Sequence, residues 1–312
     1  MAGSRCSGVV ARFDMDHHAG ILCGFGVAVV VSLSLACSPE NNGAGSGGTG
    51  GAASGSGGGG AGGTAAASGP RWVGRVDYSN PDAARFAWQG AGVIATVSGT
   101  TIAVKLRTEG TSTVYFQPVI DGTPGTRFNV DSGADQAVTL ATNLGDSDHV
   151  VELYRETEGM YGLSTFLGFT SGNVQGAPAA SGRLIEVVGD SISTGYGNLG
   201  SEPHPNWVAN PACHWTAENS SWYASYAAVA GHALNAEVST IARSGWGMYR
   251  DRDGNTSGVL SSVYANALGT GNTTPWAFEP KASVVVVNLG TNDWNQGDPG
   301  TARISAMTLS LR

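Results

Sequence analysis

The sequence of 312 residues has few charged side chains, few cysteines and no basic cluster. Its 16 lysines and arginines are scattered and the formal net charge is −8, so the positive surface that a nucleic-acid backbone requires is missing and we expect no nucleic-acid partner. Four cysteines, three of them before residue 38, do not make a disulfide framework. No cluster of His, Asp or Cys has the spacing of metal ligands. We therefore expect neither a metal nor any other cofactor.

The N-terminal segment has the features of a signal peptide. Residues 21–36, ILCGFGVAVVVSLSLA, carry no charge, but they are fewer than the roughly 20 residues that span a membrane. Arg5 and Arg12 lie upstream, as in a signal peptide. The run ends at Ala36-Cys37, which resembles a bacterial lipoprotein box and predicts a lipid on Cys37, hence a secreted or cell-surface protein. We therefore expect residues 1–37 to be a signal peptide of this kind. Ordinary cleavage after Ala36 and an uncleaved anchor are the alternatives to a lipid on Cys37.

A low-complexity stretch separates this signal from the rest of the chain. Residues 41–69 are almost entirely Gly, Ala, Ser and Thr, and such a stretch buries too little apolar surface to offset its ordering entropy. We therefore expect 38–70 to be a disordered linker that gives slack between a lipid and the folded part. The remaining residues have room for one large domain or two modest ones.

The first half of the remaining chain, 71–178, alternates apolar and polar residues. In TTIAVKLR, Ile102, Val104 and Leu106 alternate with polar neighbours, and the preceding AGVIATV predicts a hairpin across 98–100. Many short strands separated by turns are typical of an antiparallel β-sandwich. Further expected strands are 114–120, 136–142, 149–156 and 163–169.

The second half, 183–312, has the pattern of an α/β domain. LIEVV at 184–188, AEVSTIA at 236–242 and VVVVNLG at 284–290 are nearly continuous apolar runs, which is typical of parallel strands covered on both faces. Between the first two, 222–236 has helical spacing, with a cap expected at Asn219 or Ser220. Strands alternating with helices predict a parallel sheet.

Small and polar residues follow each of these three strands. They are Gly189-Asp190-Ser191, Ser244-Gly245-Trp246-Gly247 and Gly290-Thr291-Asn292-Asp293. Ligands bind beyond the carboxyl ends of parallel strands, so the three ends are expected to meet. Acyl transfer to a serine needs a hydroxyl at a sharp turn and hydrogen-bond donors for the developing oxyanion. Each block alone has another interpretation, a helix cap for the first and an ordinary turn for the third.

The three blocks together resemble a known family. VVGDSIS, ARSGWG and VVVVNLGTND are similar to the recurrent blocks of the SGNH (GDSL-like) hydrolases. With the preceding strands that start at RWVGRVDY, the chain resembles carbohydrate esterase family 2 over nearly all of 71–312. The resemblance implies a jelly-roll domain packed on an SGNH domain. It also implies the removal of O-acetyl groups from polysaccharides such as xylan and glucomannan.

The resemblance also implies roles for individual residues. Ser191 is the expected nucleophile, and Gly245 and Asn292 are expected to join the Ser191 N–H in an oxyanion hole. The nearby aromatic residues are expected to stack on sugar rings, with a plug in the hydrophobic core as the alternative for each tryptophan. These aromatic residues are Trp246, Tyr249 and Trp294.

The base that activates the serine is missing from this pattern. The family supplies a histidine near its C-terminus, whereas the last histidine here is His232, inside the expected helix. We therefore expect the SGNH domain to be partial, the histidine to follow residue 312, and the chain ending at Arg312 to have little esterase activity. His204 and His214 are weaker alternatives for the base.

Two other functions remain open at this point. One is a carbohydrate-binding protein without catalysis, and the other is an SGNH esterase that acts on lipid or aryl esters. The expected partner is an acetylated polysaccharide or oligosaccharide. Contact with a membrane is expected only through the N-terminal lipid, and the protein is expected to be a monomer.

Overall fold

The computed structural model describes residues 69–200, 216–269 and 271–300. The expected signal segment, Cys37 and nearly all of the expected linker lie outside these residues, as do His204 and His214. None of the helices in the described ranges has the length and apolar character needed to cross a membrane.

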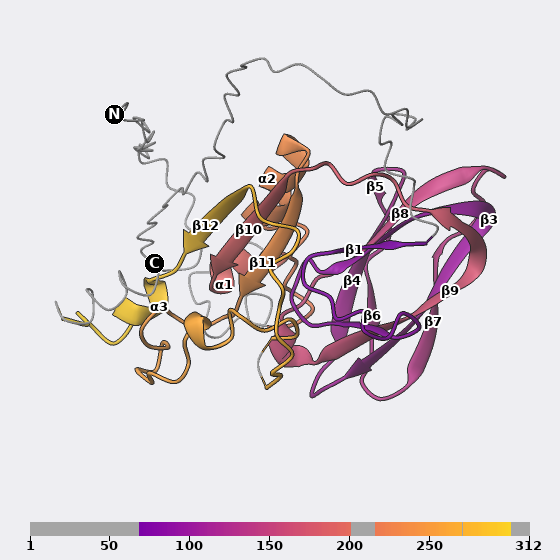
Figure 1. Cartoon of the computed structure of the whole chain (residues 1–312). Helices are drawn as coiled ribbons and strands as arrows, with labels where there is room; N and C mark the ends of the chain where they lie inside the picture. Colours follow the sequence, from indigo (N-terminus) through magenta and orange to yellow (C-terminus); the bar gives the residue numbers. More distant parts are fainter. Residues whose placement is uncertain (1–68, 201–215, 270, 301–312) are drawn as a thin grey trace, which may run out of the picture.

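The first part of the described chain is an antiparallel sheet of nine strands (Figure 1). Its main path runs β2-β9-β3-β8-β4-β5, with β1 and β7 paired to β3 and β6 paired to β4. The expected antiparallel strands are confirmed, whereas the jelly-roll topology stays a prediction. The strands are β1 (Arg71–Val73), β2 (Ala84–Phe86), β3 (Gly92–Glu109), β4 (Val114–Ile120), β5 (Thr123–Pro124), β6 (Phe128–Val130), β7 (Asp135–Ala141), β8 (Asp148–Arg155) and β9 (Leu163–Gly176), and η1 (Gly159–Tyr161) precedes β9.

The hairpin expected at 98–100 is wrong, because β3 runs through these residues as one strand. Residues 92–98 pair with β8 and residues 102–107 pair with β7, while β9 lies along both halves. The register with β9 shifts between Ser98 and Ala103, and Gly99 has φ +127°. An irregularity centred on a glycine bends a strand without reversing it. The Ser-Gly-Thr triplet therefore marks a change of partner strand instead of a turn.

The alternating apolar residues form the core of this sheet. Val104 and Leu106 of β3, Phe116 of β4 and Leu153 of β8 are buried in one hydrophobic cluster. Burial of each such side chain stabilises the fold by about 1.5–3 kcal/mol. The period of two that the sequence shows is therefore set by this core.

The second part is a three-stranded parallel sheet in the order β11-β10-β12. The strands are β10 (Leu184–Gly189), β11 (Glu237–Ala242) and β12 (Val284–Asn288), so the expected parallel sheet is confirmed. The chain goes from β10 to its neighbour on one side and then to its neighbour on the other. Such a reversal creates a crevice at the carboxyl ends of the strands.

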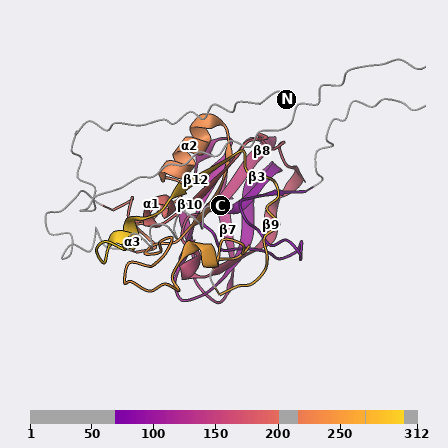
Figure 2. The same ribbon diagram turned by 60° about the vertical axis from the view of Figure 1, so that its left-hand side comes forward.

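The helices of this part lie around the sheet. Figure 1 shows α1 (Ser191–Thr194) and α3 (Thr291–Trp294) at the arrowhead ends of β10 and β12. In Figure 2, α2 (Tyr226–Leu234) lies against the sheet, and a Cβ at Gly231 would stand 2.3 Å from Val238 Cγ2 of β11. The loop after β11 contains η3 (Leu260–Ser262).

The cap expected at Asn219 or Ser220 is wrong. Ser225 precedes α2, and its side chain accepts a hydrogen bond from the N–H of Ala228. Trp222, which the sequence placed in the helix, is buried before the helix begins, and its Nε1 donates to Thr240 Oγ1 at 2.8 Å. The helix is therefore shorter at its start because Trp222 packs into the core.

The two sheets share a hydrophobic core. Ile94 and Tyr154 of the antiparallel sheet pack in one cluster with Val187, Trp222 and Val238 of the parallel part. The ring centroids of Tyr154 and Trp222 are 5.4 Å apart. The antiparallel sheet therefore packs directly against the parallel part, and Glu158, in the segment after β8, contacts Ser244 in the loop after β11.

Candidate active site

The carboxyl ends of the three parallel strands lie side by side. Gly189, the last residue of β10, pairs with Ala242 of β11 and with Asn288 of β12. The three sequence blocks that follow these residues therefore begin next to one another at the same edge of the sheet. This register brings the blocks containing Ser191, Gly245 and Asn292 to one edge.

Ser191 is the first residue of α1, directly after β10. Asp190 caps this helix, since its carboxylate accepts a hydrogen bond from the N–H of Ile192 at 3.1 Å. Ser191 is half-buried, and its hydroxyl has no hydrogen-bond partner within the described residues. The capping alternative thus holds for Asp190 and leaves the hydroxyl of Ser191 uncommitted. As the first residue of a helix, Ser191 also has an N–H without an intrahelical acceptor.

Glycine is required at the turn that presents Ser191. A Cβ at Gly189 would lie 2.0 Å from Ser193 Oγ. That hydroxyl is within 2.7 Å of the Tyr226 hydroxyl on α2, so Ser193 is fixed in place. The direction of α1 after β10 therefore depends on glycine at position 189, because any Cβ there would overlap Ser193.

The glycine block follows β11 and is tied to β10. The N–H of Arg243 donates to Gly189 O at 3.2 Å, and Gly245 has φ +79°, a conformation that favours glycine. Gly245 O accepts a hydrogen bond from the N–H of Arg252 at 2.8 Å. The backbone on both sides of Gly245 is therefore held in a closed loop.

The asparagine block contacts both other blocks. Asn292 is buried, and its Nδ2 donates to Trp246 O at 2.8 Å. The same Nδ2 lies 3.5 Å from Asp190 Oδ2, at the outer limit for a hydrogen bond. An amide carries two N–H donors, so one is engaged by the glycine block and the other is directed toward the serine block only weakly. Asn292 thus lies between Trp246 and Asp190, the neighbours of Gly245 and Ser191.

Asp293 has a structural role that the sequence analysis did not assign. It is fully buried, and its carboxylate accepts hydrogen bonds from the N–H groups of Met248 at 2.9 Å, Tyr249 at 2.7 Å and Arg250 at 3.0 Å. A Cβ at Gly247 would come within 2.3 Å of Asp293 Oδ2, so only glycine fits there. The signal was present in the sequence, because an acidic residue directly follows Asn292 and small residues precede the loop whose N–H groups donate to it.

Negative charge is concentrated around Asp190. Burial raises the pKa of Asp190 to about 6, and the carboxylates of Asp293 and Glu158 add to the effect. Burial also raises the pKa of Glu158. Glu158, in the segment after β8, accepts a 2.7 Å hydrogen bond from Ser244 N–H and was not anticipated from the sequence.

The three expected sugar-binding aromatic residues lie in the loops after β11 and β12. Trp246 is half-buried, borders the hydrophobic cluster of Ile241, and its ring centroid lies 4.2 Å from the guanidinium carbon of Arg243. Trp294 ends α3 and is 48% exposed. Tyr249 is half-buried and its N–H is held by Asp293. The core alternative therefore holds in part for Trp246 and not for Trp294.

The described histidines lie elsewhere in the fold. His149 hydrogen-bonds Asp121 at 2.7 Å in the antiparallel sheet, and His232 packs on the Tyr223 ring at the surface of α2. Within the described ranges, neither hydrogen-bonds Ser191, and no three His, Cys, Asp or Glu residues are grouped as metal ligands.

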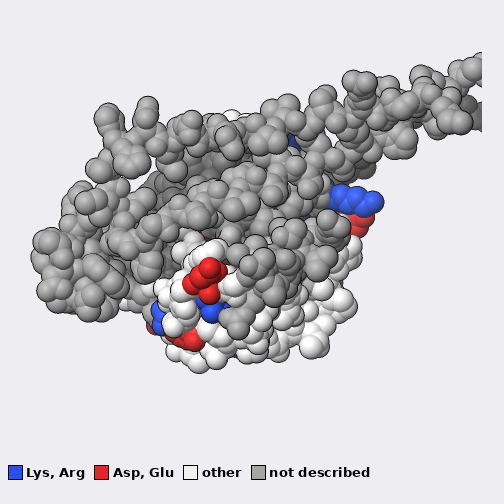
Figure 3. Space-filling view, turned by 90° about the vertical axis from the view of Figure 1, so that its left-hand side faces the viewer, with Lys and Arg blue, Asp and Glu red and all other residues white. Residues whose placement is uncertain are grey.

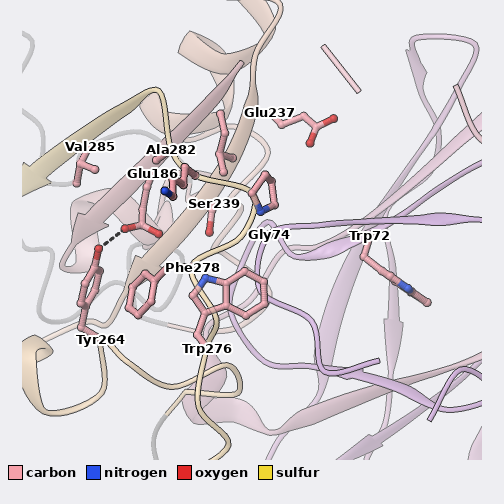
Figure 4. A pocket seen from close by; sticks show the side chains of 13 residues that line it. Trp72, Gly74, Glu186, Glu237, Ser239, Tyr264, Trp276, Phe278, Ala282 and Val285 are labelled. Atoms are coloured by element: carbon pink, nitrogen blue, oxygen red, sulfur yellow. Dashed lines mark hydrogen bonds between the residues drawn. The ribbon is translucent and has the colours of Figure 1, made fainter. Parts of the chain in front are cut away.

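A separate cavity of about 200 Å³ lies at the amino-terminal half of the parallel strands (Figure 4). The rings of Trp72, Tyr264, Trp276 and Phe278 line it, and Glu186 of β10 accepts a hydrogen bond from the Tyr264 hydroxyl. Since Ser191 follows the carboxyl end of β10, this cavity is not part of the candidate site.

On the face shown in Figure 3, the charged side chains of the described residues are dispersed. The part visible in Figure 3 is mainly uncharged, with basic and acidic side chains in small separate groups. This distribution agrees with the low content of charged residues, 13% of the chain.

Comparisons of the sequence and of the structure with known proteins point to the same family. The family model "Carbohydrate esterase 2 N-terminal" matches residues 72–179. The structure of a family two carbohydrate esterase from Clostridium thermocellum in complex with cellohexaose is 31% identical, with a TM-score of 0.70, and the match covers 78% of this chain and 72% of that one.

Two curated proteins that are similar in sequence are named as esterases. "Cellulase/esterase CelE" of Acetivibrio thermocellus is 34% identical over 71% of this chain, and an "Acetylxylan esterase / glucomannan deacetylase" of Cellvibrio japonicus is 26% identical over 77% of it. The chain spans 26% and 66% of the lengths of these relatives. From the match over both sheets, the chain belongs to carbohydrate esterase family 2.

Proposed function

We propose that this chain is a serine esterase that removes O-acetyl groups from polysaccharides such as xylan or glucomannan. One observation carries the proposal. The amide of Asn292 lies 2.8 Å from Trp246 O and 3.5 Å from Asp190 Oδ2, so the blocks after all three parallel strands meet beside Ser191. The printed names of the curated relatives support the type of substrate.

The geometry supports a reaction through an acyl-enzyme. Ser191 Oγ attacks the acetyl carbonyl carbon, and the electron pair of the C=O bond moves onto its oxygen. The N–H groups of Ser191 and Gly245 and the Nδ2 of Asn292 donate to this oxyanion. When the C=O bond re-forms, the sugar oxygen leaves and takes up a proton. Water then hydrolyses the acetyl-serine to acetate.

The proton of Ser191 must pass to a base. Of the described histidines, His149 is hydrogen-bonded to Asp121, and the His232 ring packs at a tilt against the Tyr223 ring. The expectation that the histidine follows residue 312 stays a prediction, and so do the alternatives at His204 and His214.

Substrate binding and location are proposed on the same basis. Trp246, Tyr249 and Trp294 follow the strands that carry the oxyanion donors, and aromatic rings of this kind stack on sugars. The esterase structures from Clostridium thermocellum contain cellohexaose, a glucan chain. We further propose that the protein is a cell-surface lipoprotein held through Cys37, with 38–70 as a flexible linker.

A second candidate is a glycan-binding protein without catalysis. The observation in its favour is that, among the described residues, no histidine hydrogen-bonds Ser191. This candidate retains the aromatic residues but gives no role to the Ser191 hydroxyl.

The test is acetate release from acetylated glucomannan and xylan by the full chain. The assay includes imidazole, which can accept the proton of Ser191 in place of a histidine side chain. The test therefore does not depend on which segment supplies that histidine. We expect the wild type to release acetate, Ser191→Ala to release none above background, and the control Ser261→Ala, an exposed serine of η3, to match the wild type. Retention of glycan binding with no acetate release by the wild type would favour the second candidate.

A further inference from the structure

A buried carboxylate of the antiparallel part reaches the candidate active site. Glu158 lies between β8 and η1 and is 2% exposed. Its Oε2 accepts a hydrogen bond from the N–H of Ser244 at 2.7 Å, and its Oε1 accepts one from the Ser244 hydroxyl. Its Oε1 also lies 3.3 Å from the hydroxyl of Thr194. One carboxylate therefore contacts both the glycine block and the helix that starts at Ser191.

The position of Glu158 is itself fixed. Arg155, the last residue of β8, is fully buried and donates from Nη2 to Glu158 O at 2.8 Å, from Nε to Thr157 O at 2.8 Å and from Nη1 to Ser164 Oγ at 2.7 Å. These bonds hold the segment after β8 in one conformation. Burial lowers the pKa of Arg155 to about 9, which still leaves the guanidinium charged at neutral pH.

We propose that Glu158 is a positioning residue, which holds Ser244-Gly245 and α1 in the arrangement that places the oxyanion donors around Ser191. This inference rests on the proposed esterase function. The Ser244 N–H and hydroxyl are both bound by Glu158, so the orientation of the next peptide, whose N–H is that of Gly245, is set from the antiparallel sheet. Thr194 lies one turn after Ser191, so the same carboxylate sets the distance between the two donor groups.

The proposal gives the antiparallel sheet a part in catalysis. It is not only a support, because its segment 155–158 supplies the contact that joins two of the three strand-end blocks. The matched control is Glu156 in the same segment. Glu156 is equally buried, but its carboxylate accepts from Ser221 Oγ at 3.0 Å and from the N–H of Tyr223 at 2.9 Å, outside the three blocks.

The experiment compares Glu158→Ala, Glu158→Gln and Glu156→Gln in the full chain. The first readout is hydrogen exchange of peptides covering 243–247. The second is acetate release in the same imidazole-containing assay, analysed as kcat and KM. We expect Glu158→Ala to accelerate exchange in 243–247 and to lower kcat about 100-fold with KM changed less than about twofold, because misplaced oxyanion donors act on the transition state.

The two other variants sharpen the test. Glu158→Gln retains an amide oxygen that can accept from the Ser244 N–H, so we expect its kcat to lie between those of Glu158→Ala and the wild type. If Glu158→Ala does not fold, Glu158→Gln replaces it in both measurements. Glu156→Gln is expected to leave exchange in 243–247 and kcat at wild-type values. Unchanged exchange or unchanged kcat in Glu158→Ala, or equal effects of the Glu156 and Glu158 changes, would overturn the inference. If the wild type releases no acetate, the esterase proposal fails, while the exchange data still decide whether Glu158 holds the loop.

Discussion

Replacing Asp190 by Asn should change how stability depends on pH. Burial, with the nearby carboxylates of Asp293 and Glu158, raises the pKa of Asp190 from 3.8 to about 6. The folded state therefore binds a proton more tightly at this group than the unfolded state does. The resulting stabilisation is complete below the unfolded pKa and is lost as the pH rises through about 6.

The magnitude follows from the size of the shift. Two pKa units at about 1.4 kcal/mol each give about 3 kcal/mol, an order-of-magnitude value. Asn at 190 retains an oxygen for the N–H of Ile192, which Asp190 binds at 3.1 Å, so the cap of α1 is kept. We expect the unfolding free energy of the wild type, relative to Asp190→Asn, to fall by about 3 kcal/mol between about pH 4 and pH 7.

The assay is urea unfolding followed by tryptophan fluorescence at a series of pH values. Asp82→Asn, which removes an exposed carboxylate of the antiparallel part, is the matched control. The titrations of Glu156 and Glu158 are present in both proteins, so they largely cancel in the difference. A difference that stays constant with pH, or that grows in favour of the wild type as pH rises, would refute the reasoning about Asp190.

Three further predictions concern the site and the N-terminus. Asn292→Ala should lower kcat for acetate release about 100-fold or more with little change in KM, since it removes one oxyanion donor, and an unchanged kcat would exclude Asn292 from that role. Gly189→Ala should destabilise the fold by about 1–3 kcal/mol in urea unfolding, because the added methyl would overlap Ser193, and equal stability would show that α1 shifts freely. Cys37→Ser should abolish incorporation of labelled fatty acid in a bacterial host, and undiminished labelling would rule out lipidation at Cys37.

The strands of the parallel sheet were predictable because each is marked by a run of consecutive apolar residues. The valine run in β12 and the apolar run in β10 are recognisable in the sequence, and the edge where they end follows from the rule that parallel strands share their carboxyl ends. The meeting of Asn292 with the neighbours of Ser191 and Gly245 follows from that rule and from the register of Gly189 with Asn288.

The other features depend on partners that are distant in the sequence. The glycine at 99 marks a bend because β9 pairs with β3 on both sides of it, and no local pattern distinguishes this from a hairpin. Trp222 is excluded from α2 because Thr240 and Tyr154 provide a buried place for its ring. Glu158 has no sequence signal, since its acceptor role exists only when the two sheets are packed together.

The central claim is that the ends of three parallel strands bind a single acyl oxygen beside Ser191. The most direct test is a crystal structure of the full chain after reaction with a methylphosphonate ester, prepared with imidazole in the buffer. We predict phosphorus bonded to Ser191 Oγ, with one phosphonyl oxygen within about 3.1 Å of the N–H nitrogens of Ser191 and Gly245 and of Asn292 Nδ2. An adduct on another residue, or an adduct on Ser191 whose oxygens approach neither Gly245 nor Asn292, would contradict the account.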